Sequence, residues 1–217
     1  MLITQNGRWR PFAHDNQGAG HAADGKATPP QGAHTQGRAS VARHAYPATD
    51  NLSEKLAHEI RTRATPGRGN VWRMLLWTPN TAEKFIDYSE AVRFGNDIPE
   101  KLRELIILRV GNLCGAAYEV HHHKRLGRQA GMSESSIEAS AIGPTAPDID
   151  DAERFALRMA DELVRDKQLS ESTFEEAVKQ YGVRTVADII LIVGFYTMAC
   201  MFLNSFGIEI EPEPVRA

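Results

Sequence analysis

Two helical patterns that meet at a short turn constrain the fold of this chain more than any other stretch. The stretch covers residues 98–131 and reads IPEKLRELIILRVGNLCGAAYEVHHHKRLGRQAG, with a turn of small residues at 111–115. In the first helix, Glu104 shares a face with Ile107, Leu108 and Gly111, because positions three, four and seven residues on lie on the same side. We therefore expect Glu104 to point inward.

The second helix carries three consecutive histidines that cannot share a face, because successive helical residues are about 100° apart. His121 lies on a basic face and is expected in water. His123 shares a small, apolar stripe with Glu119, four residues earlier. An imidazole and a carboxylate therefore lie on one inward face, near a second inward carboxylate.

The rest of the chain is also helical in pattern, and no segment shows sustained strand alternation, so the fold class is all-α with about seven helices. Ser133, Asp150 or Asp151, and Ser170 are expected to cap helices. Asn80 and Glu83 resemble a capping box. The further helical ranges are 52–64, 71–77, 80–93, 134–142, a helix from about 151, one from 170 that ends before Gly182, and 184–204. The last of these is apolar nearly all round and is expected to be buried on most sides.

Composition excludes several classes of protein. The 217 residues carry a formal net charge of −3, which argues against nucleic-acid or anionic-membrane partners. Two cysteines, Cys114 and Cys200, make no disulfide framework and suit a reducing compartment. No signal peptide is apparent, and the apolar run 189–203 is short for a membrane span of about 20 residues. We expect a cytoplasmic protein with no membrane partner.

The chain divides by composition near residue 50. Residues 1–50 are rich in Gly, Ala, His, Gln, Asp and Pro, and such a segment buries too little apolar area to offset its ordering entropy. It is expected to be extended or disordered, or to be an arm over a neighbouring subunit. Residues 51–217 are expected to form the all-α domain.

At residues 104–139 the chain resembles a known family. ELIILRVGNLCGAAYEVHHHKRLGRQAGMSESSIEA is similar to the carboxymuconolactone decarboxylase family, also called the alkyl hydroperoxidase D-like family. The matching residues are Arg103-Glu104-Leu105, Tyr118-Glu119, His123 and Gly131. The resemblance extends from about 70 to 211, roughly two thirds of the chain, and implies a helical fold that forms trimers or hexamers.

The candidate catalytic residues are Glu104, Glu119, His123, Tyr118 and Cys114. A carboxylate that orients the imidazole raises its proton affinity, and histidine titrates near about 6.5, so a small shift suits acid–base chemistry at neutral pH. The alternative is that Glu119 and His123 are an i, i+4 pair that stabilises the helix and has no catalytic role. Tyr118 either donates from its phenol or packs, and His122 lies on an adjoining face.

Redox chemistry is the second hypothesis. Peroxidase members of the resembled family carry C-x-x-C, in which one thiolate attacks the peroxide and the other resolves the sulfenic acid. Aligned on His123, those two positions are Ala116 and Glu119. Cys114 lies at the helical turn without a local partner. Thiol-dependent hydroperoxide turnover is therefore expected to be weak and independent of Cys200.

The resemblance implies a cofactor-free decarboxylase or lyase as the leading hypothesis. Glu104, Glu119 and His123 supply suitable acid–base groups for a small organic acid or lactone, with Arg103 and Arg109 as candidates for binding its carboxylates. Two alternatives remain: an antioxidant protein that uses Cys114, and a non-catalytic oligomeric binding protein. A third alternative is a metal site formed by Glu104, Glu119 and His123. The chain is expected to be a homo-oligomer.

Overall fold

The computed structural model describes residues 2–3, 9–10, 42–50, 52–64 and 69–212. The chain divides into two units, Met1–Arg38 and Ala39–Ala217. In the first unit, β1 (Leu2–Ile3) pairs antiparallel with β2 (Trp9–Arg10). Most of the expected N-terminal arm lies outside the described residues.

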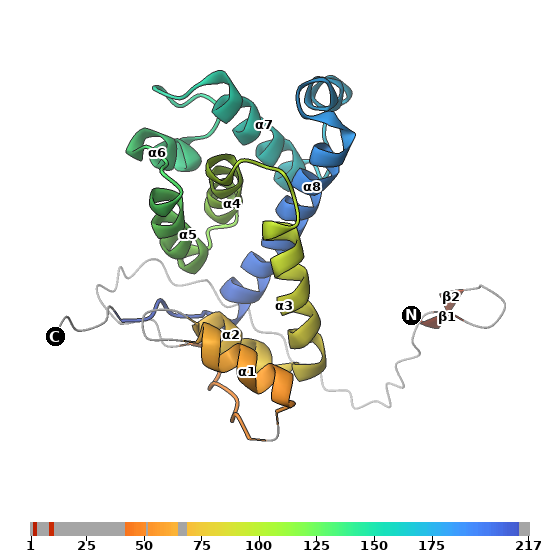
Figure 1. Cartoon of the computed structure of the whole chain (residues 1–217), viewed down its shortest axis with the longest axis vertical. Coiled ribbons are helices and arrows are strands. Elements are labelled where there is room, and N and C mark those ends of the chain that lie inside the picture. Colours follow the sequence, from red (N-terminus) through yellow and green to blue (C-terminus); the bar gives the residue numbers. More distant parts are fainter. Residues whose placement is uncertain (1, 4–8, 11–41, 51, 65–68, 213–217) are drawn as a thin grey trace, which may run out of the picture. The chain divides into compact units, whose positions relative to one another are not determined.

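The second unit is all-α, as predicted (Figure 1). Its elements are α1 (Glu54–Arg63), α2 (Asn70–Met74), the 3₁₀ helix η1 (Leu75–Trp77), α3 (Pro79–Phe94), α4 (Glu100–Leu113), α5 (Ala117–Gln129), α6 (Glu134–Ile142), α7 (Asp151–Arg165) and α8 (Glu171–Phe206). Ser133, Asp150 and Ser170 cap α6, α7 and α8, which confirms those expectations. Gly182 has non-helical backbone angles, so α8 is two helices joined at a kink where the sequence predicted a break.

The helix at the centre of this unit is α4. It packs against α5, α6, α7 and α8, and every residue from Arg103 to Gly111 is buried. Its apolar side chains divide between two core clusters, one toward α7 and α8 and one toward α5 and α6. Because neighbours cover it on all sides, even its charged residues lie inside the protein.

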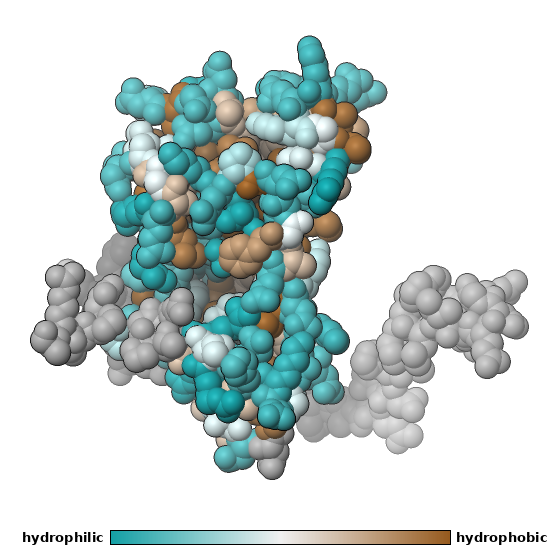
Figure 2. Space-filling view, viewed as in Figure 1, coloured by the Kyte–Doolittle hydropathy of each residue, from teal (hydrophilic) through white to brown (hydrophobic). Residues whose placement is uncertain are grey.

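The helix α8 is less buried than its composition predicts. Among the described residues it is the one helix long and apolar enough to cross a membrane, and half of its most apolar window is buried. A stripe of exposed side chains runs along the other side: Ile190, Leu191, Met198 and Met201. Gly194 lies in the same stripe, because these positions recur every three or four residues. The face shown in Figure 2 is mostly hydrophilic, with scattered hydrophobic patches.

We propose that this stripe joins copies of the chain in a trimer or hexamer. Covering apolar area is favourable by roughly 25 cal/mol per Å², and closed symmetric rings are a common solution for such surfaces. Light scattering behind a sizing column should give a multiple of the 24.1 kDa chain mass. Met201→Glu, with Met201 62% exposed, should shift the protein toward monomer. A wild-type species of 24.1 kDa would contradict the proposal.

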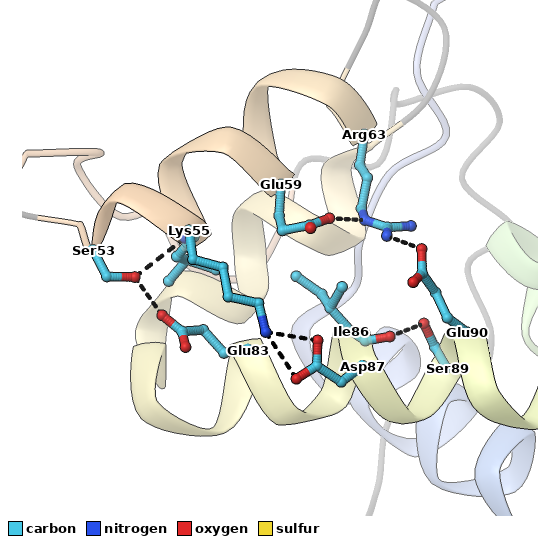
Figure 3. A network of polar contacts seen from close by, with 10 residues as sticks. Ser53, Lys55, Glu59, Arg63, Glu83, Ile86, Asp87, Ser89 and Glu90 are labelled. Carbon is cyan, nitrogen blue, oxygen red and sulfur yellow. Dashed lines mark hydrogen bonds and ion pairs between the residues drawn. The ribbon is translucent and has the colours of Figure 1, made fainter.

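The α1 helix is fastened to α3 by a row of polar contacts (Figure 3). Lys55 bonds to Asp87, and Arg63 pairs with Glu90 and with Glu59 of its own helix. This row holds Arg63 beside α3, where it borders the cavity described below.

The predicted capping box at the start of α3 is wrong. Thr78 is the N-cap and Pro79 opens the helix, so Asn80 lies inside the first turn. Glu83 accepts a hydrogen bond from Ser53 at the start of α1 instead. A proline at the first helical position needs no hydrogen-bond partner there, and this moves the start of the helix upstream of Asn80.

Candidate active site

The turn between α4 and α5 determines how closely these helices approach. Gly115 closes the turn with φ +62°, a left-handed conformation that favours glycine. At Gly111, an added Cβ would lie 3.1 Å from Val120 Cγ2 and 3.6 Å from Glu119 Cβ. The lack of a side chain at Gly111 therefore lets α5 lie against α4, which brings Glu119 and His123 toward Glu104.

His123 lies between two carboxylates. Its Nδ1 is 2.6 Å from Glu104 Oε2, and its Nε2 is 2.9 Å from Glu119 Oε1. All three residues are buried, with Glu104 1% exposed. Only the imidazolium has an N–H group on both nitrogens, so the doubly protonated form satisfies both carboxylates. The structure thus brings together the three residues that the helical faces placed inward; their catalytic role stays a prediction.

The electrostatics of this triad favour a charged imidazole. Burial by itself lowers the pKa of His123, but the charges of Glu119 and Glu104 and hydrogen bonds to both raise it to about 9. Burial raises the pKa of Glu104. The hydrogen bond from His123 and the positive charges of His123, Arg93 and Arg103 lower it by more, so the pKa lies below its usual value. At neutral pH the triad holds one imidazolium and an ionised Glu104.

Arg93, from the last turn of α3, completes the cluster and was missed in the sequence. Its Nη2 donates to Glu104 Oε1 at 3.2 Å, and its Nε is buried without a hydrogen-bond partner among the described residues. Burial lowers the pKa of Arg93, but the negative groups around it raise it above its usual value, so the guanidinium stays charged. A basic residue in a last helical turn is common, so its sequence position does not reveal the role.

A cavity of about 410 Å³ opens on this cluster. Glu119, His123 and Arg93 lie in its wall. Glu104 lies behind this wall, where it contacts His123 and Arg93. The other charged or basic residues of the cavity are Arg63, Glu90, His122 and Arg125. Its aromatic residues are Trp72, Phe85, Phe94, Tyr118, Phe195 and Tyr196. Apolar walls with a few polar groups at one place, in a cavity of this size, are typical of small-molecule sites.

Tyr118 lines the cavity but belongs to a different polar group. Its hydroxyl donates to Glu211 Oε1 at 2.7 Å, and His122 Nε2 lies 2.9 Å from Glu211 Oε2. Burial raises the pKa of Glu211, but hydrogen bonds from His122, the Asn70 backbone and Tyr118 lower it to about 2. Burial and Glu211 raise the pKa of Tyr118 above its usual value. Tyr118 therefore fastens the C-terminal tail to α5 and supplies one wall of the cavity.

Cys114 ends α4 at the place where that helix packs against α8. It packs against the core cluster that contains Cys200, and Asn204 of α8 donates from Nδ2 to the Cys114 carbonyl at 2.8 Å. Cys114 and Cys200 are free thiols.

The two arginines considered for substrate binding lie outside the cavity wall. Arg109 is 3% exposed, and its Nη2 donates to Asp161 Oδ2 at 2.9 Å, with Nη1 donating to the carbonyls of Ser140 and Ala141 at the end of α6. Arg103 lies 3.5 Å from Glu100 and 4.0 Å from Glu104. Arg109 therefore joins α4, α6 and α7, and its predicted binding role is wrong.

The metal hypothesis finds no support in the donor geometry. Both nitrogens of His123 already face carboxylate oxygens. Within the described ranges, no group of three or more His, Cys, Asp or Glu side chains is arranged to hold a metal ion.

Comparison with known proteins agrees with this architecture. Residues 79–162 match the carboxymuconolactone decarboxylase family. The alkylhydroperoxidase AhpD core of a peroxidase-related protein from Ralstonia eutropha JMP134 is 21% identical, with a TM-score of 0.68 over 78% of this chain and 92% of that one. An Agrobacterium tumefaciens protein of unknown function, suggested to be an antioxidant defence protein AhpD, is 19% identical, with a TM-score of 0.58 over 65% and 96%.

The debrominase Bmp8, in complex with 2,3,4-tribromopyrrole, is 17% identical, with a TM-score of 0.65 over 79% of this chain and 94% of that chain. Comparison with curated proteins gave no match. The helical unit therefore has the fold of the AhpD core. Over residues 79–162, the chain is similar to the carboxymuconolactone decarboxylase family.

Proposed function

We propose that this protein is a cofactor-free acid–base enzyme that decarboxylates a small unsaturated organic acid or lactone acid. The observation that carries the proposal is His123 held between Glu119 and Glu104 at the wall of a cavity. Such an arrangement stores a proton on a group of raised pKa beside a carboxylate that faces the cavity. General acid–base catalysis by one such group contributes about 10²–10⁴ in rate.

The cavity suits a flat, negatively charged molecule. Arg93 offers a charged guanidinium in its wall, with Nε unpartnered among the described residues, and arginine binds carboxylates in a planar, two-point arrangement. Aromatic rings form an apolar part of the cavity wall. Among them, the ring centroids of Phe195 and Tyr196 are 5.3 Å apart and the ring planes are nearly perpendicular. The debrominase Bmp8 is in complex with a flat ring, 2,3,4-tribromopyrrole, which supports the flat shape of the ligand but not its charge.

The proposed step breaks the bond between the substrate carbon and its carboxylate. Carbon dioxide leaves, and the electron pair stays on the carbon, delocalised onto the neighbouring lactone carbonyl. The His123 imidazolium gives its Nε2 proton to the Glu119 carboxylate, and Glu119 passes this proton to the carbon and becomes a carboxylate again. His123 is later reprotonated from water. Glu104 and Arg93 remain charged throughout and hold the imidazole in place.

Carbon dioxide release from carboxymuconolactone by the full chain tests this function. We expect turnover without added metal or organic cofactor, and a loss of about 10²-fold or more in kcat for Glu119→Gln. Glu138→Gln, a matched change at an exposed position on α6, should leave kcat unchanged. Equal turnover by Glu119→Gln would rule out its role. Hydroperoxide turnover in place of carbon dioxide release would favour the antioxidant alternative.

A further inference from the structure

The aromatic side chains of the cavity include four that form a continuous row from the candidate site. The row begins where the ring centroid of Tyr196 is 5.2 Å from that of His123. Tyr196 is followed by Phe195 at 5.3 Å, and Phe195 by Phe85 at 4.8 Å. Trp72 ends the row, 6.4 Å from Phe85. All four line the cavity, and we call Trp72, Phe85, Phe195 and Tyr196 the aromatic row.

The aromatic row becomes more buried toward the candidate site. Trp72 comes from α2 and Phe85 from α3, and both are half-buried. Phe195 and Tyr196 come from α8 and are 5% and 4% exposed. The cavity is therefore closed at the Tyr196 end of the row and more open at the Trp72 end.

The closed end of the cavity carries the charge that suits a carboxylate. Arg93 and His123 both line the cavity and both contact Glu104, so the guanidinium and the imidazole lie at the same end. The Arg93 side chain is 23% exposed, which leaves part of the guanidinium accessible. Because a guanidinium binds a carboxylate in a planar, two-point arrangement, this end suits the acid group of a ligand.

The open end of the cavity has no comparable site for a second carboxylate. The Arg63 Cζ lies 5.3 Å from the centroid of the Trp72 ring, but Arg63 already pairs with two carboxylates, those of Glu59 and Glu90. Arg125 also lines the cavity, but it is exposed, where an ion pair contributes little. The open end therefore suits an apolar group.

We propose that the cavity binds a carboxylic acid with an aromatic arm, its carboxylate at Arg93 and its arm along the aromatic row toward Trp72. The inference deepens the proposed function and rests on it for the position of the carboxylate. Aromatic rings prefer offset or edge-to-face packing at about 4.5–7 Å, which is the spacing within the row. The volume of about 410 Å³ lies in the range of about 300–1,000 Å³ typical of drug-sized ligands, so an arm fits beside the reacting group.

Isothermal titration calorimetry of the full chain with 4-phenylbutanoate tests the proposal. 4-Phenyl-1-butanol, which lacks the carboxylate, should bind about 10-fold or more weakly. 4-Cyclohexylbutanoate keeps the shape but not the aromatic face and should bind about 2–10-fold more weakly. Hexanedioate, with a second carboxylate in place of the ring, should bind about 10-fold or more weakly. Equal or tighter binding of any of these three, or no binding of 4-phenylbutanoate, would overturn the proposal.

A matched pair of tryptophan variants locates the arm. Trp72→Ala should weaken the binding of 4-phenylbutanoate by about 5-fold, because it removes one ring of the aromatic row. Trp77→Ala is the same change at a residue that is 48% exposed and outside the cavity wall, and it should leave the affinity unchanged. Circular dichroism establishes that each variant is folded. Equal losses in the two variants would contradict the placement of the arm.

Fluorine NMR of the wild-type sequence labelled with 5-fluorotryptophan gives a readout that does not depend on how a variant folds. The Trp72 resonance is assigned by its loss in Trp72→Phe. Saturation with 4-phenylbutanoate should shift this resonance and leave that of Trp77 in place. A Trp72 resonance that stays unmoved at saturation would also overturn the proposal.

Binding and turnover can fail separately. The titrations require no chemical step, whereas carbon dioxide release from carboxymuconolactone tests the acid–base groups. Binding of 4-phenylbutanoate as described, without any decarboxylation, would support the aromatic row as a ligand site and remove the proposed function. Decarboxylation without binding of 4-phenylbutanoate would support the proposed function and overturn the inference about the arm.

Discussion

Replacing His123 with glutamine is expected to lower kcat for the proposed decarboxylation by about 10²–10⁴-fold. Glutamine can still hydrogen-bond to one carboxylate, but it cannot store a proton between Glu104 and Glu119. KM should change little, because Arg93 and the aromatic walls remain in place. The matched control is His121→Gln, the same substitution two residues away at an exposed position, which should keep wild-type kcat.

The pH profile separates a proton donor from a structural histidine. The pKa of His123 is raised to about 9, so the imidazolium is present below that pH, and wild-type kcat should fall as pH rises through about 9. Residual activity of His123→Gln should lack this descending limb. A wild-type rate that is flat from pH 7 to 10 would exclude His123 as the donor.

The same raised pKa links His123 to stability. Its folded pKa of about 9 exceeds the unfolded value of about 6.5. The stabilisation is therefore fully present below pH 6.5 and is lost as pH rises through about 9. The free energy of unfolding of the wild type should decline over this window, and that of His123→Gln should decline less. This comparison gives a control for folding in the kinetic experiment.

Replacing Asp161 with alanine is expected to destabilise the protein by about 3–5 kcal/mol, the range for breaking one side of a buried ion pair. Arg109 is 3% exposed and has Asp161 as its carboxylate partner. Without Asp161, its charge stays buried beside the carbonyls at the end of α6. The variant should unfold at a markedly lower urea concentration, with an unchanged slope.

Two further variants show that the unpaired charge causes this loss. Asp87→Ala removes an exposed ion pair with Lys55, whose side chains are 48% and 47% exposed, and should change the urea midpoint little, because surface pairs contribute little. The double replacement of Arg109 by Met and Asp161 by Leu should recover most of the stability, since it removes both charges. An Asp161→Ala midpoint equal to wild type would contradict the assignment of Arg109 to the core.

Local sequence pattern was sufficient to predict the helices and the inward positions of the central residues of the candidate site. Helical spacing placed Glu104 and His123 on inward faces, because side-chain direction along a helix follows from its period alone. The caps at Ser133 and Asp150 could likewise be predicted, since a capping side chain bonds to the backbone two or three residues away. These features depend on neighbours within one or two turns of the chain.

The remaining parts of the site depend on packing between elements that are distant in sequence. Arg93 reaches Glu104 from α3, Asn204 reaches the Cys114 carbonyl from α8, and Glu211 reaches Tyr118 from the tail. The exposure of one side of α8, and the burial of α4 on all sides, also follow from which helices cover which faces. Composition alone cannot tell whether α4 or α8 is buried on all sides. The number of neighbours around each helix decides which one is central, and that number is a property of the folded chain.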